Sequence, residues 1–137
     1  MITFSPNQII KSADLNANFS ELKDKTDILT TPTTWAGVTY ANSWVDYDSN
    51  NWYGVQYYKD ALNIVHLRGL TKSGTTTSGT TMFTLPVGCR PARACLFVVI
   101  SNGAIGRVDL GTDGAMKTNS VSNSYVSFNN IHFLAEQ

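Results

Sequence analysis

Residues 11–32 read KSADLNANFSELKDKTDILTTP, and the longer part of the chain that follows has a different character. Ser12 can cap a helix, and Asp14 lies in the first turn, where the helix dipole favours an acid. Residues 13–29 contain neither Gly nor Pro. We therefore predict a helix over residues 13–29.

The predicted helix carries a narrow apolar stripe whose members are alternately four and three residues apart. We call the stripe the seam, and its residues are Leu15, Phe19, Leu22, Thr26 and Leu29, with Thr26 filling an otherwise apolar position. Two apolar residues in seven are typical of a coiled coil, whereas a helix on its own domain's core has a wider apolar face. The seam therefore favours a stem joining copies of the chain. Two heptads are marginal alone, so the following domain must support the bundle.

Two other interpretations of this helix stay open. It could pack on its own domain's sheet, with Ile28 joining Leu22 and Leu29, or it could be a disordered or partner-bound arm. The sequence TTPTT at residues 30–34 then ends the helix, because Pro32 disfavours helical geometry in the residue before it. We predict an N-terminal attachment segment and helix over residues 1–29, a linker over 30–34, and a β domain over 35–137.

From Trp35 onward the apolar period changes to two, and the residues favour strands. Thr, Ser, Asn and Gly are abundant, 15 of the 137 residues are aromatic, and charged residues make up only 15%. We predict strands within 35–40, 43–47, 53–58, 62–70, 82–86, 94–101, 106–118 and 125–136. The segment 94–101, ACLFVVIS, is predicted to be fully buried. About eight strands at this spacing indicate a sandwich, jelly roll or barrel, and we expect a jelly-roll-like antiparallel β-sandwich.

The connections between these strands carry turn signals. KDALN at residues 59–63 predicts a hairpin, and Thr112-Asp113-Gly114 predicts another. GTTTSGTT at residues 74–81 predicts a flexible surface loop.

Charge and hydropathy exclude several classes of protein. Ten Lys plus Arg balance ten Asp plus Glu, so we expect neither nucleic-acid binding nor attraction to an anionic membrane. The longest apolar run is far shorter than the roughly 20 residues of a membrane helix. The N-terminus does not resemble a secretory signal, which predicts assembly in a host cytoplasm. Cys89 and Cys95 are then expected to be free, buried or half-buried thiols.

The sequence offers little catalytic chemistry. His66 and His132 lie in strand patterns without the spaced partners that zinc needs, so we interpret both as structural. Hydrolase and nucleotide motifs are absent. DYDSNN at residues 46–51 begins like a calcium loop, but Asn51 and Tyr57 stand where Gly and Glu are required, which favours an acidic turn. We expect no enzyme activity, no cofactor and no metal.

Aromatic residues are concentrated in residues 35–58, which contain three Trp and five Tyr. Not all of them fit a single small core, and Trp and Tyr both stack on sugars and populate protein interfaces. Alternation also lets half of them fill the core while the others flank turns, so core and subunit packing and an exposed binding surface both stay open. Trp52 and Tyr53, beside the Asp-Asn turn, are predicted to be exposed. Together with the loop residues Thr76 and Thr77 and the turn residue Asp113, they form the predicted ligand surface.

Several motifs resemble parts of tailed-bacteriophage virion proteins. IKSADLNANF at residues 10–19 is similar to a phrase, I-K-S-x-x-[LV]-N-A-N-F, that begins a short N-terminal helix in many small virion proteins of these phages. VHLRG at 65–69, LPVGCRP at 85–91 and the final strand YVSFNNIHFLAE at 125–136 resemble the C-terminal tip domains of phage tail fibres and minor tail proteins. Cys89 stands where that family usually has Tyr.

The resemblance implies a homotrimer with a jelly-roll-like head on a helical stem, located in the virion. It implies a tail-fibre or receptor-binding tip that attaches to the phage tail by its N-terminal region and presents its head to a host saccharide or surface protein. A head-fibre or capsid-decoration protein on the phage shell is the alternative. A carbohydrate-active depolymerase is a remote one, since the carboxylate pair it needs would have to come from residues in predicted turns, namely Asp46, Asp48, Asp109 and Asp113.

Overall fold

The computed structural model of the chain describes residues 1–3, 6, 9–30 and 34–136. The chain divides into two compact units, Met1–Pro32 and Thr33–Gln137, and each has its own architecture. Most of the predicted linker at residues 30–34 lies outside the described residues.

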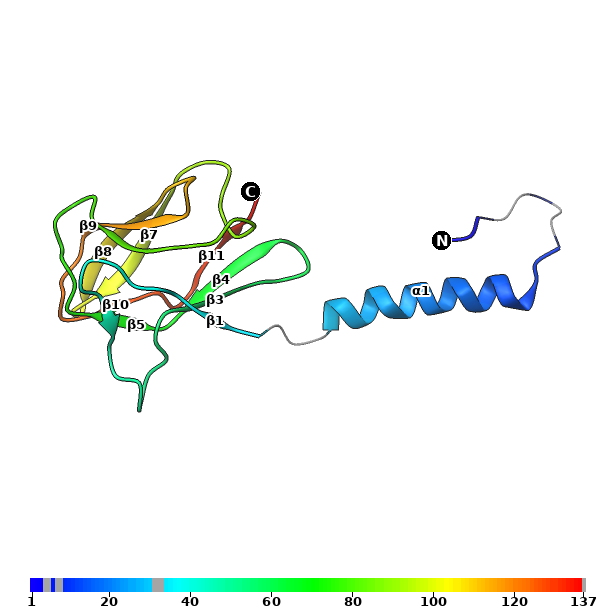
Figure 1. Cartoon of the computed structure of the whole chain (residues 1–137), viewed down its shortest axis with the longest axis horizontal. Helices are drawn as coiled ribbons and strands as arrows, with labels where there is room; N and C mark the ends of the chain where they lie inside the picture. Colours follow the sequence, from blue (N-terminus) through cyan, green and yellow to red (C-terminus); the bar gives the residue numbers. More distant parts are fainter. Residues whose placement is uncertain (4–5, 7–8, 31–33, 137) are drawn as a thin grey trace. The chain divides into compact units, whose positions relative to one another are not determined.

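The first unit contains one helix, α1 (Ser12–Thr30), so the predicted helix is confirmed (Figure 1). The carbonyl of Lys11 accepts hydrogen bonds from the backbone N–H groups of Asp14 and Leu15, at 3.0 and 3.3 Å. On the polar side, Lys25 Nζ lies 2.9 Å from Glu21 Oε1, a pairing four residues apart that supports an exposed helix.

The chain's first residues fold back onto this helix. Asn18 Oδ1 accepts a hydrogen bond from Ile2 N at 2.8 Å, and Asn18 Nδ2 donates to Ile2 O at 3.0 Å. The terminal ammonium of Met1 lies 2.8 Å from Glu21, and with Lys25 it lowers the pKa of that carboxyl. Asn18 and Glu21 do not belong to the seam, so the described contacts of Met1 and Ile2 are made outside it.

The second unit is mainly β. Its strands are β1 (Ala36–Gly37), β2 (Val45–Asp46), β3 (Gln56–Lys59), β4 (Ile64–Arg68), β5 (Leu70–Lys72), β6 (Thr81–Thr84), β7 (Cys95–Ser101), β8 (Ala104–Leu110), β9 (Ala115–Ser120), β10 (Val126–Ser127) and β11 (Ile131–Leu134). The sequence predicts fewer strands because three of the predicted segments, 62–70, 106–118 and 125–136, each cover parts of two strands. The hairpin predicted at 59–63 joins β3 and β4, and the one predicted at 112–114 joins β8 and β9.

The strands form two curled antiparallel sheets (Figure 1). The first has the order β1-β3-β4-β11 and the second the order β2-β5-β10-β7-β8-β9-β6. Every strand pairing in the described part of the chain is antiparallel. The predicted class, mainly β and sandwich-like with an N-terminal helix, is confirmed at this level. The trimeric stem remains a prediction.

A single hydrophobic cluster draws on both sheets. The rings of Phe83 and Phe128 meet edge to face with centroids 5.3 Å apart, and both are fully buried. Around them lie other fully buried side chains, namely Val55, Val65, Met82, Leu85, Val108, Leu110, Met116 and Val126. Each such side chain contributes about 1.5–3 kcal/mol by leaving water. The cluster fixes the sheets that carry the candidate site.

The prediction that residues 94–101 form a fully buried strand is wrong. In β7, Val99 and Ser101 are buried, whereas Leu96 and Val98 are 62% and 74% exposed. The sequence run is apolar throughout, so it hides the alternation of a strand that covers the core with one face only. The exposed side chains of β7 lie next to Ile105 of β8, which is 80% exposed. We call the surface of Leu96, Val98, Ile100 and Ile105 the apolar β face.

Candidate functional site

The outward face of the first sheet carries polar and aromatic side chains at alternate positions. In β4, Val65 and Leu67 are buried while His66 and Arg68 are only half-buried, because successive residues of a strand point to opposite faces. This alternation places the imidazole and the guanidinium on the same side of the sheet.

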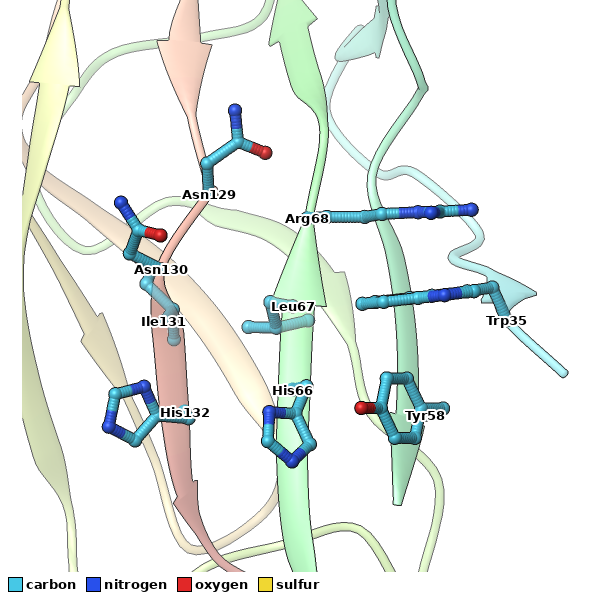
Figure 2. Close-up of a pocket in the computed structure, with 9 residues that line it drawn as sticks. All are labelled: Trp35, Tyr58, His66, Leu67, Arg68, Asn129, Asn130, Ile131 and His132. Carbon is cyan, nitrogen blue, oxygen red and sulfur yellow. The ribbon is translucent and has the colours of Figure 1, made fainter. Parts of the chain in front are cut away.

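The register of the neighbouring strands adds partners to that face. Gln56 of β3 is paired with Arg68, and Tyr58 of β3 is paired with His66. On the other side of β4, His132 of β11 is also paired with His66. A cross-strand row of Tyr58, His66 and His132 results, and Figure 2 shows these three side chains lying side by side.

Arg68 is held between two aromatic rings. Its guanidinium carbon lies 4.1 Å from the ring centroid of Trp35 and 3.7 Å from that of Tyr53. Figure 2 shows the guanidinium and the Trp35 indole stacked in parallel planes. Arg68 Nε donates to Gln56 Oε1 at 2.9 Å, and among the described residues its two Nη groups have no acceptor. These contacts fix the cation while leaving the Nη end of its donor fork available.

A second set of ring contacts orders the rest of the row. Tyr58 meets Trp35 edge to face at 4.5 Å and stacks on His66 at 4.7 Å. His66 Nε2 lies 2.8 Å from Asp60 Oδ2, and its ring centroid is 6.4 Å from that of His132. These contacts order the row of Tyr58, His66 and His132, which we call the wall.

These side chains line an open hollow of about 590 Å³ (Figure 2). We call it the Arg68 hollow, and it is lined by Trp35, Tyr58, His66, Leu67, Arg68, Asn129, Asn130, Ile131 and His132. Its polar groups are a guanidinium, two imidazoles, two carboxamides and a phenol. The lining contains no carboxylate, so the hollow is rich in hydrogen-bond donors.

Asp60 supports this wall from the turn between β3 and β4. Its Oδ1 accepts hydrogen bonds from the backbone N–H groups of Leu62 and Ile64, at 2.8 and 3.0 Å. The hydrogen bond with His66 lowers the pKa of the Asp60 carboxyl most, and the bond from Ile64 N adds to the effect. One carboxylate thus closes the hairpin and holds the imidazole.

We predict that this carboxylate makes the stability of the β domain depend on acid pH. Because its pKa is depressed by folding, the stabilisation is present above the unfolded pKa of about 3.9 and is lost as pH falls through the folded value. Asp60→Asn should lower the melting temperature by a few degrees at pH 7 and by less at pH 2. His66→Gln should remove part of the same pH-dependent difference. A deficit for Asp60→Asn that is constant across this pH range would contradict the assignment.

A second hollow lies on the outward face of the other sheet. We call it the Tyr125 hollow, of about 380 Å³, and it is lined by Tyr47, Trp52, Leu70, Ile100, Tyr125, Ser127 and Asn129. The rings of Tyr47 and Tyr125 meet edge to face at 5.7 Å, and the ammonium of Lys72 lies 5.3 Å from the Tyr47 ring centroid. Trp52 is 52% exposed. Aromatic faces beside hydroxyl and amide groups suit the apolar and polar faces of a sugar ring.

The two hollows adjoin where two chain segments pass from one sheet to the other. Between β4 and β5 only Gly69 intervenes, and between β10 and β11 the chain passes through Asn129. Asn129 Oδ1 accepts a hydrogen bond from Gly69 N at 2.9 Å, and Phe128 N donates to Gly69 O at 2.8 Å. Asn129 lines both hollows, and within the described residues its Nδ2 has no acceptor.

The loop that supplies Tyr53 is fastened by the half-buried phenol of Tyr40. Tyr40 Oη donates to Asp46 Oδ1 at 2.8 Å and accepts from Val55 N at 2.9 Å. Burial raises the pKa of Tyr40 far above its usual value, so the phenol stays protonated and keeps both bonds. The backbone of Tyr53 in turn accepts a hydrogen bond from Leu70 N at 2.9 Å. Tyr53 is thus tied to the segment that carries Arg68.

Comparisons with known proteins identify one similar fold. No protein-family model matches the sequence, and no curated protein matches it. Among solved structures, the chain is similar to the receptor binding protein (gp15) of Listeria phage PSA, with a TM-score of 0.68. The fold resembles that of a phage receptor binding protein. The likeness covers 96% of this chain and 83% of the phage protein at 16% sequence identity, so it concerns the fold.

The structure brings together only part of the predicted ligand surface. Trp52 and Tyr53 are 52% and 61% exposed. Trp52 lines the Tyr125 hollow, and the ring of Tyr53 lies against the guanidinium of Arg68. Thr77 O accepts a bond from Thr118 Oγ1 at 2.6 Å, and Asp113 Oδ1 accepts one from Ala115 N at 3.0 Å. Neither of these residues nor the half-buried Thr76 lines either hollow.

Other predicted residues have structural surroundings of their own. Asp48 accepts hydrogen bonds from Asn50 N and Asn51 Nδ2, at 3.1 and 2.7 Å, as an acidic turn would. The described residues contain no cluster of His, Cys, Asp and Glu fit for a metal. Cys89 and Cys95 are free and half-buried, as predicted, and burial raises the pKa of Cys95. Within the described part of the chain, α1 lacks the length of apolar sequence that crossing a membrane requires.

The seam residues are exposed in this chain. Leu15, Leu22 and Leu29 are 40%, 47% and 64% exposed, and Phe19 is 66% exposed. Thr26 is exposed as well, with its Oγ1 donating to Leu22 O at 2.9 Å. Exposed large apolar side chains in a line indicate a contact surface.

Proposed function

We propose that the protein is a non-enzymatic component of a tailed-phage virion, a homotrimeric receptor-binding or tail-fibre tip. The observation that carries the proposal is the fold likeness to the receptor binding protein of Listeria phage PSA over nearly the whole chain. The N-terminal motif and the three motifs of the β domain support the same setting. The N-terminal region attaches the protein to the phage tail, and the β domain faces the host.

The hollows give the β domain a surface suited to host saccharide. Trp35, Tyr53, Trp52 and Tyr125 offer aromatic edges and faces, and Asn129 offers amide donors between them. Sugars are recognised by such combinations, because rings stack on their C–H faces while amides and hydroxyls bind their O–H groups.

The homotrimer is supported by two unpartnered apolar surfaces. One is the seam of α1, and the other is the apolar β face, where Val98 and Ile105 are 74% and 80% exposed. Beside that face, Arg107 forms a fork with Asp109 through bonds of 2.7 and 3.0 Å, so its charges are neutralised within the chain. Such a surface matches another copy of itself better than a charged partner.

Non-enzymatic action is supported by the bonding of the carboxylates named as depolymerase candidates. Asp109 is bound by Arg107, Asp46 by Tyr40, and Asp113 by its own turn. Each therefore has a structural partner that accounts for its presence.

Cell binding tests this proposal. Purified, fluorescently labelled protein should bind host cells, and Trp52→Ala should reduce the bound fraction by about tenfold, since a stacked ring contributes on the order of 1–2 kcal/mol per copy. Leu62→Ala is the matched control, because Leu62 is 65% exposed in a hairpin turn away from both hollows. Its binding should equal that of the wild type.

Location in the particle is the second arm of the test. Immunogold labelling should mark the tail tip of intact virions. Labelling of the head, with binding to empty capsids and none to tails or cells, would overturn the proposal in favour of a head-fibre or decoration protein.

A further inference from the structure

Resting on the proposed receptor-binding role, we propose that the Arg68 hollow binds an acidic group of the host glycan. The group is a carboxylate or a phosphate carried on a sugar, and the adjoining Tyr125 hollow holds the next, uncharged sugar unit. The ligand class is therefore an acidic polysaccharide in which a charged unit is followed by a neutral one.

Arg68 is a cation without a neutralising acid in the described part of the chain. In the described residues, Arg68 has no carboxylate within ion-pair distance, whereas Arg107 is paired with Asp109. The carboxylate of Asp60, which is bound by His66 of the same strand as Arg68, is engaged by that imidazole and by two backbone N–H groups. A half-buried guanidinium without an acid is stabilised when a ligand supplies one.

The guanidinium of Arg68 is preorganised by its neighbours. Trp35 and Tyr53 cover the two faces of the guanidinium, and Gln56 takes its Nε–H. Only the Nη edge can then receive a ligand, and that edge is the planar fork that suits the two oxygens of a carboxylate or phosphate. Because the side chain is already ordered, binding costs little of the rotamer entropy that a free arginine would lose.

The side chains around Arg68 in the hollow carry no negative charge. Around Arg68 the hollow presents the imidazoles of His66 and His132 and the amides of Asn129 and Asn130. The imidazole of His132 and the two amides can donate hydrogen bonds, whereas His66 already uses its Nε2 on Asp60. None of these groups is an anion that would repel an acidic ligand. The charged groups behind the wall are Asp60, which is bound by His66, and Lys59, which is exposed at the end of β3.

The Arg68 hollow and the Tyr125 hollow share a boundary at Asn129. Asn129 lines both, and its Oδ1 is used by Gly69 N, so its Nδ2 can donate to a ligand that crosses from one to the other. The second hollow has three Trp or Tyr rings, Tyr47, Trp52 and Tyr125, whereas the first has two. An uncharged sugar ring fits that lining, whereas its linked acidic neighbour reaches Arg68.

Defined oligosaccharides test the proposal by calorimetry or NMR titration on the full-length protein. Hyaluronan tetrasaccharide, which alternates a uronate and a neutral sugar, should bind at least about tenfold more tightly than neutral chitotetraose. Its affinity should fall as salt rises. Glucuronate and glucose 6-phosphate then distinguish a carboxylate from a phosphate as the preferred acid.

Variants assign the two subsites. Arg68→Ala should reduce the preference for the acidic tetrasaccharide to about twofold or less, and Arg68→Lys, which keeps the charge but loses the fork, should retain only part of it. Arg93→Ala, which removes an exposed arginine that lines neither hollow, should change nothing. Trp52→Ala should weaken the tetrasaccharide about tenfold while leaving glucuronate unchanged.

Two results would overturn the inference. One is equal affinity of wild-type protein for both tetrasaccharides, and the other is no binding of either acidic monosaccharide at about 10 mM. If host-cell binding persists in either case, the inference fails while the proposed function stands. Loss of cell binding together with capsid location would instead remove the proposed function.

Discussion

Gly69→Ala should destabilise the β domain by about 3–5 kcal/mol and lower its melting temperature by about 15 °C or more. Gly69 has φ +105°, a backbone conformation that residues other than glycine rarely adopt. A Cβ at this position would also overlap the carbonyl oxygen of Gly54 and lie 2.8 Å from that of Tyr53. Both neighbours are backbone atoms, so relief requires moving the segment that carries Tyr53.

Gly79→Ala is a matched control for this substitution. Gly79 also has positive φ, at +86°, but a Cβ there would meet nothing within 4 Å. We expect a loss of only about 1 kcal/mol, the cost of the backbone conformation alone. Thermal melts followed by circular dichroism measure both variants. Equal losses would show that the contact of Gly69 with Gly54 is unimportant.

The features that could be predicted from the sequence are those with local causes. The helix over 13–29 follows from the capping residue, the absence of Gly and Pro, and the seam, and α1 matches it. The β3–β4 and β8–β9 hairpins follow from their turn residues. A further signal, Asn102-Gly103, is a strong hairpin marker with both residues at positive φ, and it predicts the β7–β8 pairing that the structure contains.

The candidate site depends on pairings that no local pattern encodes. Arg68 belongs to a recognisable phrase, VHLRG, and the alternation of β4 predicts that it faces outward with His66. Trp35 and Tyr53 lie 33 and 15 residues earlier in the chain. The order β1-β3-β4 brings Trp35 near Arg68, and the hydrogen bond from Leu70 N to the carbonyl of Tyr53 holds the second ring there. Asn129 reaches Gly69 only because two segments cross between the sheets together.

Loop composition was a weaker guide to the ligand surface. Thr76 and Thr77 are polar residues of a loop, and this loop is fastened to β9 through Gly79 N donating to Thr118 O at 2.7 Å. The loop backbone therefore has a structural role, and the role of the loop in binding stays a prediction. Apolar runs were equally ambiguous, since ACLFVVIS gave no sign of which side chains face outward.

Phe19→Asp combined with Leu22→Asp should convert a trimer of the full-length chain into monomers. These two side chains are 66% and 47% exposed in the chain, and in a three-helix stem each would be covered by its counterparts. The double variant removes six apolar side chains from the contact line and puts six carboxylates there, which costs far more than a two-heptad bundle can supply. Light scattering at ~10 µM should give one third of the wild-type mass.

Ala17→Asp combined with Ser20→Asp separates the effect of charge from the effect of the seam. The pair has the same spacing and adds the same charge, but its residues are exposed on the polar side of α1. The trimer should persist, and the β domain of both double variants should melt near the wild-type temperature, because the helix and the β domain are separate compact units. A monomeric wild-type chain would defeat the stem. A trimer that survives in both variants would instead assign assembly to the apolar β face, which Val98→Asp with Ile105→Asp would then dissociate.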